Sequence, residues 1–133
     1  MKNIEDFEKT IGYNFKDKKL LKIALTHKSY LDEKPDLVSN QRYEFFGDTI
    51  LDFDLTEYLF KHFPDLDEGS LTKIRSSAVN QSNLVKLGNE INIGSYMFLS
   101  KAEDSTGGRK KSSIIEDAVA VSYTHLTLPT TPY

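Results

Sequence analysis

The longest uninterrupted helical pattern in the chain runs from Gln41 to His62, and it limits the possible folds more than any other feature. No proline interrupts it, and Pro64 follows shortly after its end. Apolar side chains recur at helical spacing around a wide arc of this segment. A helix that is apolar over such an arc buries more than one side. We therefore predict a long central helix that is contacted on several sides.

Helical patterns also account for most of the remaining chain. The ranges predicted as helices are 4–11, 18–27, 66–80 and 81–92, followed by a last helix that begins near Ser112 or Ser113. We interpret residues 31–39 and 102–111 as loops, and residues 93–101 as a short apolar helix or strand. No strong alternating pattern of the kind typical of strands is present. The sequence thus predicts an all-α fold.

Composition narrows the class of protein. With 133 residues, the chain can form one domain with its own core. It has no cysteine, which excludes disulfides, zinc–thiolate sites and thiol nucleophiles. The net charge of -3 argues against binding nucleic acid by bulk positive charge, so a polyanion site would have to be local or assisted by metal ions. No segment has the length of a membrane span, and the N-terminus lacks the apolar core of a signal peptide. We expect a cytoplasmic protein with no membrane partner.

Two carboxylates, Glu44 and Asp48, lie four residues apart in the long helix, so both side chains leave the same face one turn apart. Like charges at this spacing repel each other, whereas a divalent cation between them would compensate the repulsion. Asp117 lies on the exposed side of the last helix, and oxygen ligands of this kind suit Mg²⁺ or Mn²⁺. We predict a metal site where the two helices meet. The alternative is a solvated helix edge that pairs with Arg42 or a lysine.

Gly47 lies between the two carboxylates, inside the predicted helix. A glycine in a helix interior costs about 1 kcal/mol relative to alanine. Its presence therefore needs a structural reason. We predict that another helix, or a ligand, approaches the backbone closely at this position.

Four segments in the same order resemble the motifs of the ribonuclease III family. The run NQRYEFFGDTIL at residues 40–51 resembles the family signature, and IALTHKSY, DEGSLTKIR and GGRKKSSIIEDA at residues 23–30, 67–75 and 107–118 resemble three further motifs. The resemblance covers nearly all of the chain up to Ala120. It implies the helical ribonuclease III endonuclease-domain fold. It also implies a homodimer whose interface lies on the long helix around Phe45 and Phe46.

The resemblance also implies an activity, which is Mg²⁺-dependent endonucleolytic hydrolysis of double-stranded RNA. The expected products carry 5′-phosphate and 3′-hydroxyl ends, and the expected roles are the processing of rRNA and of other structured transcripts. Glu44, Asp48 and Asp117 would be the metal ligands, with Mn²⁺ able to replace Mg²⁺. Asp48 would lie nearest the reacting phosphate, as the catalytic residue. Ala120 occupies the fourth ligand position, where the family has glutamate.

Because Ala120 replaces a ligand, we expect weak metal binding and impaired cleavage by the chain as it stands. One alternative is a catalytically inactive module that binds double-stranded RNA or dimerises. Another is a metal-independent helical interaction domain. Two further positions depart from the family pattern, since Gln41 replaces a usual glutamate and Asp54 replaces a usual aliphatic residue.

Several other residues have both a functional and a structural interpretation. Arg109, Lys110 and Lys111 follow two glycines and are predicted to contact RNA phosphates, although a solvated basic loop would give the same pattern. Glu68 is either an accessory acid of the site or an acid that favours a helix N-terminus. His27 is expected to be a capping or core histidine.

The last thirteen residues, VSYTHLTLPTTPY, differ from the rest of the chain, since they carry no charge but four threonines and two prolines. Residues 121–130 equal the translation of a common transposase-based sequencing adapter. We predict that residues 121–133 are a non-native tail, which sequencing of the source gene across codon 120 would test. Residues 1–120 would then be a nuclease domain with an incomplete last helix, and the double-stranded-RNA-binding domain usual in bacterial members would be absent. The alternative is a genuine disordered C-terminus.

Overall fold

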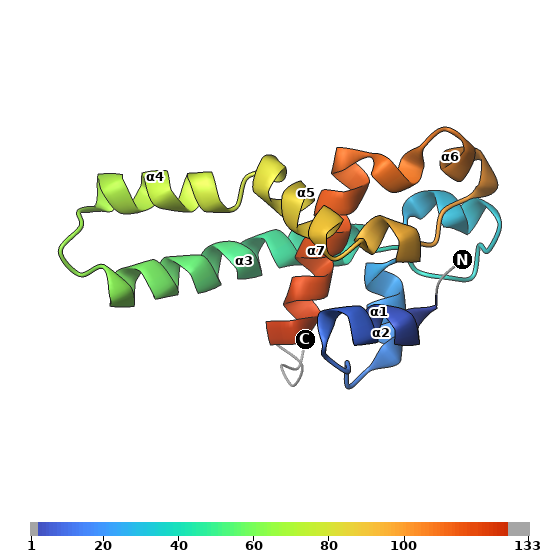
Figure 1. Ribbon diagram of the computed structural model, residues 1–133, viewed down its shortest axis with the longest axis horizontal. Helices are drawn as coiled ribbons and strands as arrows, with labels where there is room; N and C mark the ends of the chain where they lie inside the picture. Colours follow the sequence, from blue (N-terminus) through green and yellow to red (C-terminus); the bar gives the residue numbers. More distant parts are fainter. Residues whose placement is uncertain (1–2, 128–133) are drawn as a thin grey trace.

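A computed structural model describes residues 3–127, with the side chains of residues 3–124 (Figure 1). In chain order the helices, including three short 3-10 helices (η), are α1 Ile4–Ile11, α2 Lys18–Ala24, η1 Lys28–Asp32, α3 Gln41–His62, α4 Glu68–Ala78, α5 Gln81–Glu90, η2 Ile93–Tyr96, α6 Lys101–Ser105, η3 Gly108–Lys110 and α7 Ser112–Thr127. The described residues form one isolated β-bridge, between Thr26 and Phe98, and no longer strand. The predicted all-α fold is confirmed. None of the described helices is long and apolar enough to cross a membrane.

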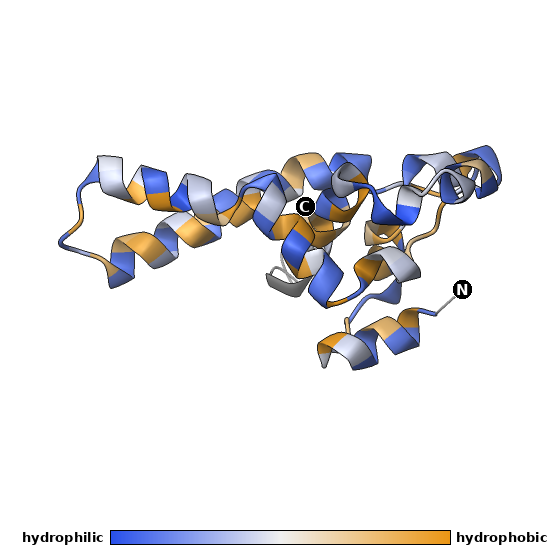
Figure 2. Ribbon diagram, turned by 45° about the horizontal axis from the view of Figure 1, so that its top comes forward, coloured by the Kyte–Doolittle hydropathy of each residue, from blue (hydrophilic) through white to orange (hydrophobic). Residues whose placement is uncertain are grey.

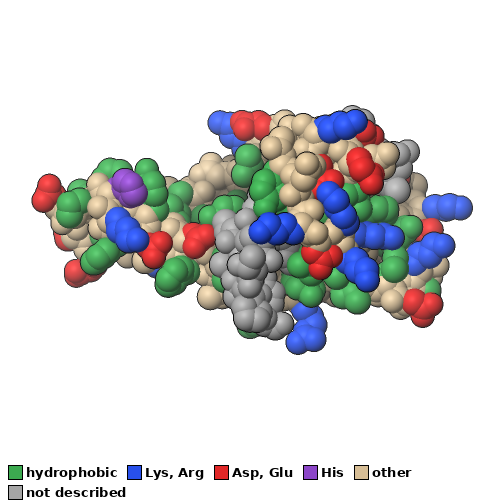
Figure 3. Space-filling model, turned by 90° about the horizontal axis from the view of Figure 1, so that it is seen from below, with side chains coloured by type: hydrophobic (Ala, Val, Ile, Leu, Met, Phe, Trp, Pro, Cys, Tyr) green, Lys and Arg blue, Asp and Glu red, His purple; other side chains and the backbone are tan. Residues whose placement is uncertain are grey.

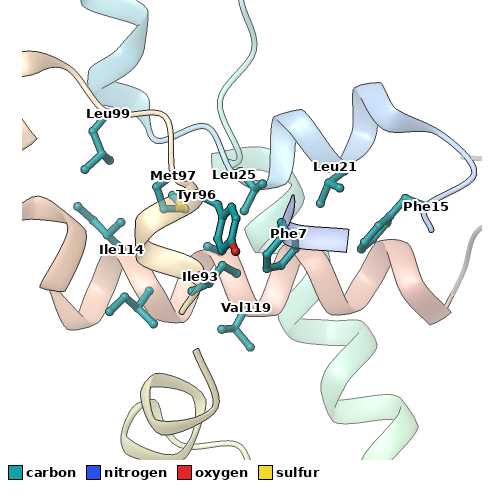
Figure 4. Packing of buried hydrophobic residues seen from close by; sticks show 12 residues of the cluster. Phe7, Phe15, Leu21, Leu25, Ile93, Tyr96, Met97, Leu99, Ile114 and Val119 are labelled. Carbon is teal, nitrogen blue, oxygen red and sulfur yellow. The ribbon is translucent and has the colours of Figure 1, made fainter. Parts of the chain in front are cut away.

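Helix α7 runs through the centre of the hydrophobic core. It packs against α5, α3 and α2, and Ile115, Ala118 and Val119 on it are buried. Figure 4 shows side chains from α1, α2 and η2 gathered against this helix. The cluster consists of Phe7, Phe15, Leu21, Leu25, Ile93, Tyr96, Met97, Leu99, Ile114, Ile115, Ala118 and Val119. Residues from both ends of the described chain thus stabilise one core.

Helices α3 and α4 form a two-helix arm that projects away from the body (Figure 1). The arm is held together partly by the side chain of Arg75, whose Nη1 donates to Thr56 Oγ1 at 2.9 Å. Apolar side chains recur along the arm (Figure 2), and several are exposed: Phe45 by 81%, Phe53 by 64% and Phe60 by 73%. The contacts that we expected on several sides of α3 are therefore present only in part within one chain.

Side-chain caps explain where most helices begin. In five α-helices the residue before the first turn accepts a hydrogen bond from a backbone N–H of that turn: Asn3, Asp17, Asp67, Asn80 and Ser100. The start of α3 differs, because the side chain of Asn40 donates to the carbonyl of Ala24 at 2.9 Å. The Asn40 N–H donates to the carbonyl of Thr26, also at 2.9 Å. These bonds fix the first turn of α3 against the end of α2.

Glu8 fastens α1 to the loop that follows it. Its side chain is 3% exposed, accepts a hydrogen bond from the Phe15 N–H at 2.6 Å and forms an ion pair with Lys18. Burial alone would raise the pKa of Glu8, but the bonds from Lys18 and from the Phe15 N–H lower it overall. Glu8 is therefore a paired buried charge that holds the N-terminal segment on the core.

The prediction is wrong for the end of α2 and for the segment 102–111, and the two errors have different causes. Helix α2 ends at Ala24 rather than at 27, because Thr26 leaves the helix to pair with Phe98. The range 102–111, predicted as loop, contains α6 and η3. Helix α6 begins because Ser100 Oγ accepts from the Glu103 N–H at 3.1 Å.

Helix α7 continues past position 120 to Thr127, so the change in composition at position 121 does not end it. Val121 and Thr124 are buried, and the hydroxyl of Tyr123 donates to Asp54 Oδ2 at 3.0 Å. The non-native origin of residues 121–133 stays a prediction. The two prolines of that segment lie outside the described residues.

Candidate active site

Helices α3 and α7 cross in close contact at Gly47. A Cβ atom at this position would lie 2.6 Å from Thr124 Oγ1 and 3.1 Å from the carbonyl oxygen of Ala120. Side chains larger than glycine's hydrogen would therefore push the two helices apart. The prediction that another helix approaches Gly47 closely is confirmed. The crossing also brings the residues on either side of Gly47 next to the middle of α7.

Four carboxylates gather at this crossing, Glu44 and Asp48 from α3 and Glu116 and Asp117 from α7. The side chains of Glu44 and Asp48 share a hydrogen bond, and the charges of the two α7 acids act on Glu44 as well. Asp48 and Glu116 line one cavity of about 230 Å³, together with Asp52. The structure thus brings together the three acids that the sequence singled out, and adds Glu116.

Burial and mutual repulsion raise the pKa of three of these acids. Burial, followed by the hydrogen bond and charge of Asp48, raises the pKa of Glu44 to about 7. Burial and the charges of Glu116 and Asp48 raise the pKa of Asp117 to about 6. Burial and the charge of Asp48 also raise the pKa of Glu116. The ionised cluster is therefore under electrostatic stress that a bound cation would relieve.

Positively charged side chains do not relieve this stress within the described part of the chain. The ion pairs found there are Lys18–Glu8, Lys61–Glu57, Arg109–Asp104 and Lys111–Glu103, and none includes an acid of the cluster. The alternative interpretation, a solvated helix edge, therefore lacks the ion pairs with Arg42 or a lysine among the described residues.

The cluster fits a divalent metal ion in its chemistry but is incomplete in its arrangement. Carboxylate oxygens are the donors that Mg²⁺ and Mn²⁺ prefer. Among the described residues, however, no three His, Asp or Glu side chains are placed to hold one metal ion. Ala120, one turn after Asp117, is fully buried at the crossing and offers no side-chain oxygen. The site has suitable donors, but the described side chains do not bring three of them around one ion.

The sequence analysis missed Glu116, although a signal was present. Glu116 lies four residues before position 120, so the two positions share a face of α7. Asp52 has the same relation to Asp48 on α3. An acid one turn from a predicted ligand position could thus have been included, but only the crossing shows that Glu116 faces Asp48 in one cavity.

Arg109 has a structural role in the chain. Its Nη1 donates to the carbonyls of Met97 at 2.7 Å and Gly94 at 3.1 Å, and its Nε donates to Asp104 at 2.9 Å. These bonds tie the segment before α7 to the segment after η2. The guanidinium predicted to contact RNA is therefore turned toward the protein.

The two neighbouring lysines differ in their surroundings. Lys111 Nζ lies 2.8 Å from Glu103 Oε2, and this ion pair stands beside His27, on which both charges act. Lys110 is exposed. His27 caps η1, because its Nδ1 accepts from the Ser29 N–H at 3.1 Å, which agrees with the structural role expected for it.

Glu68 does not join the carboxylate cluster within one chain. It begins α4 at the far end of the arm and lines a cavity of about 170 Å³ with Leu59, Phe60 and Arg75, among other residues. Twelve residues of α3 separate Asp48 from Phe60, which corresponds to about 18 Å along the helix. A role of Glu68 as an accessory acid would therefore require its arrival from another chain.

The first turns of α3 present an exposed apolar surface. Phe45 is 81% exposed, and with Phe46, Gln41, Arg42 and Thr49 it lines a hollow of about 620 Å³. This surface lies on the same helical turns as Glu44 and Asp48. A second protein bound there would therefore lie next to the carboxylates.

Comparison with known proteins identifies the family. The family described as Ribonuclease-III-like matches residues 17–121, so this chain belongs to the ribonuclease III family. Ribonuclease 3 from a Nitratiruptor species is 52% identical over 118 residues, which cover 89% of this chain and 50% of that protein. Ribonuclease 3 from a Sulfurovum species is 49% identical over 118 residues, covering 89% and 51%. This chain spans about half the length of these curated relatives.

A solved structure gives the same picture of the fold. The nuclease domain of ribonuclease III from Campylobacter jejuni superposes with a TM-score of 0.86 at 41% identity, covering 96% of this chain and 87% of that one. That structure is described for its flexibility in a region involved in dimer formation. The predicted ribonuclease III nuclease-domain fold is confirmed.

Proposed function

We propose that this chain is the nuclease domain of a bacterial-type ribonuclease III, which hydrolyses double-stranded RNA endonucleolytically with Mg²⁺, or with Mn²⁺ in its place. The products would carry 5′-phosphate and 3′-hydroxyl ends. The crossing of α3 and α7 carries this proposal, since it gathers Glu44, Asp48, Glu116 and Asp117, none of which forms an ion pair within the described residues. Processing of rRNA and other structured transcripts, in the cytoplasm, is proposed from the family alone.

The carboxylates of the chain would act as metal ligands, and without the metal ion they would repel RNA. A bound divalent cation supplies an acidified water and neutralises charge on the attacked phosphate. Glu44, Asp48 and Asp117 would hold it, with Asp48, the exposed member at the cavity, nearest the phosphate. While unneutralised, the same carboxylates repel an RNA backbone. The site therefore admits its substrate only when cation-loaded.

Ala120 makes a second function worth testing. The described residues hold no complete set of three metal donors, which favours a module that binds double-stranded RNA or dimerises without cutting. We propose that the chain as it stands cleaves slowly for this reason. Restoring a carboxylate at position 120 would then restore the activity.

The test compares the chain with Ala120→Glu and with Ala120→Gln, a control of matched size that carries no negative charge. A labelled RNA duplex is incubated with Mg²⁺, and cleavage and duplex binding are both measured. We expect Ala120→Glu to cleave more than about 100-fold faster than the chain itself, and Ala120→Gln to give little gain. Duplex binding without cleavage in all three would replace the nuclease by the non-cutting module. If none of the three proteins binds or cleaves the duplex, the remaining interpretation is a metal-independent helical interaction domain.

We further propose a homodimer through the first turns of α3, around Phe45 and Phe46, in which each subunit cuts one RNA strand. The 81% exposure of Phe45, which lines one hollow with Phe46, supports this, because a contiguous exposed apolar patch marks an interaction site. Sedimentation velocity should show a dimer for the chain and a monomer for Phe45→Ser. A monomer for the unchanged chain would contradict the proposal.

Among the basic residues before α7, we propose that Lys110 meets RNA phosphates. Its exposure supports this role. The bonds of Arg109 and Lys111 within the chain make these two residues supports of the segment that carries Lys110.

A further inference from the structure

The tip of the arm combines exposed apolar and acidic side chains. The tip is the turn between α3 and α4, residues 63–68, where Phe63 is 42% and Leu66 38% exposed. Asp65 lies between them, and residues 48–68 together contain seven acids and one lysine. Figure 3 shows hydrophobic and acidic side chains on the arm, while most of the lysine and arginine side chains in view lie over the body. The tip is thus a short acidic segment with two apolar side chains in water.

The body carries a cavity of the opposite character. This α2 cavity, about 310 Å³ in volume, is lined by Lys19, Lys22, Ile23, Thr26, Asp36, Leu37 and Val38. Val38 is 55% exposed, and in the described part of the chain neither lysine belongs to an ion pair. Lys22 Nζ lies 5.5 Å from the centroid of the Phe98 ring, and Asp36 sets one negative charge against the two lysines of the cavity. Aliphatic walls next to this net positive charge suit an apolar side chain that is flanked by carboxylates.

The tip cannot reach the α2 cavity of its own chain. Helix α3 has 22 residues, about 33 Å in length, and its first residue lies close to the end of α2. The tip and α2 stand at opposite ends of the molecule (Figure 1). An arm tip that occupies this cavity must therefore come from a second copy of the chain.

We propose that the arm tip of one copy docks into the α2 cavity of a second copy, so that Leu66 lies against Ile23 and Val38 and Asp65 approaches Lys19 and Lys22. This inference rests on the homodimer proposed above. Two α3 helices that meet around Phe45 across a two-fold axis perpendicular to both run past each other in opposite directions, and this is the arrangement that the docking requires.

In such a dimer each arm passes the start of the partner's α3, beside which the α2 cavity lies. The tip lies about 27 Å along α3 from Phe45, whereas the partner's α3 begins only about 6 Å beyond the same point, so the tip extends past that helix and over the partner's body. The contact would form twice, once in each direction, as two-fold symmetry requires. Two acidic arms would then be neutralised by the lysines of the opposite body.

A cross-linking experiment tests the placement, since the chain has no cysteine of its own. Leu66→Cys and Val38→Cys are made as separate proteins, mixed and treated with a short bismaleimide. The control mixes Leu66→Cys with Leu87→Cys, because Leu87 is 46% exposed on α5 and lies outside the proposed contact. Mass spectrometry should find the 38–66 linked peptide at least about tenfold above the 66–87 peptide. Circular dichroism confirms that each protein is folded.

The outcomes separate this inference from the homodimer. A dimer in sedimentation with no excess of the 38–66 peptide would overturn the docking and leave the dimer standing. A monomer in sedimentation would overturn both the docking and the homodimer. The expected result is a dimer with the specific cross-link.

Charge reversal tests whether attraction between Asp65 and the lysines of the α2 cavity stabilises the dimer, and it is measured as the dimer dissociation constant. Lys22→Glu and Asp65→Lys should each raise the dimer dissociation constant about tenfold, and an equimolar mixture of the two should regain most of the lost affinity. Lys86→Glu, the same change on exposed α5, should leave the constant unchanged. If Lys22→Glu weakens binding of an RNA duplex and leaves dimerisation intact, the α2 lysines contact RNA and the docking is wrong.

Discussion

Replacing Glu44 by glutamine should stabilise the metal-free protein at pH 8. Burial and the Asp48 carboxylate raise the pKa of Glu44 from 4.5 to about 7 in the folded state. The folded state therefore keeps a proton that the unfolded chain has already released. The stability is full below pH 4.5, falls as the pH rises, and has reached its lower value above pH 7. Glutamine has nearly the same shape as glutamate and carries no charge, so Glu44→Gln removes this loss of stability at high pH.

The magnitude follows from the same two values. The difference between 4.5 and about 7 corresponds to about 3 kcal/mol if it acted at full strength. Glu44 is partly exposed, and solvent screening reduces the effect to about 1–2 kcal/mol. At pH 5 the gain should shrink to below about 0.5 kcal/mol, because little of the loss has yet developed.

Urea unfolding followed by circular dichroism, at pH 8 and pH 5 with a chelator, measures the gain. Glu57→Gln is the control, since Glu57 is an exposed acid on the same helix, 3.8 Å from Lys61. An equal effect of Glu44→Gln at the two pH values, or destabilisation at pH 8, would refute the electrostatic reasoning. Adding Mg²⁺ should stabilise the unchanged chain more than Glu44→Gln, because the cation supplies the missing countercharge.

Three further perturbations test the helix crossing, the segment before α7 and the N-terminal helix. Gly47→Ala should lower the unfolding free energy by about 1–3 kcal/mol, and by less than about 1 kcal/mol in a Thr124→Ala background, because the nearest contact at 2.6 Å is then removed. Arg109→Ala should lower the melting temperature, whereas Lys110→Ala should change only RNA-duplex affinity; the reverse result would exchange the two roles. Glu8→Gln should destabilise the protein at pH 7 in urea unfolding. Because the folded state lowers the pKa of Glu8, only the ionised carboxylate stabilises the protein. The difference between Glu8→Gln and the unchanged chain should therefore vanish as the pH falls below 4.5 and Glu8 becomes protonated.

The local pattern of the sequence was enough to predict helices where the helix bonds only to itself. The ranges predicted for α1 and α3 agree with the observed Ile4–Ile11 and Gln41–His62. The prediction failed where a distant segment competes for the backbone, as at Thr26, whose pairing partner Phe98 is 72 residues away. Periodicity within a short window contains no information about such a partner.

The site was predictable to the extent that spacing decides it. The spacing of four residues from Glu44 to Asp48 is enough to place both acids on one face of a helix. Spacing alone could not decide whether Asp117 joins them, because that depends on how α7 crosses α3. It also could not show that the apolar face of α3 stays in water along the arm, since a periodic apolar stripe looks the same whether its partner belongs to the same chain or to another.

The helix crossing connects the stability of the fold with the chemistry of the site. Gly47 lets α7 approach until the Ala120 carbonyl would touch a Cβ atom, and only this closeness puts acids from the two helices within reach of one another. Their repulsion is then a cost of folding, visible in the raised pKa values of Glu44 and Asp117. A cation would turn that cost into binding energy, because it attracts all the carboxylates at once. Position 120 lies at this crossing, so a carboxylate there would add a donor for the cation and, without the cation, would add to the repulsion.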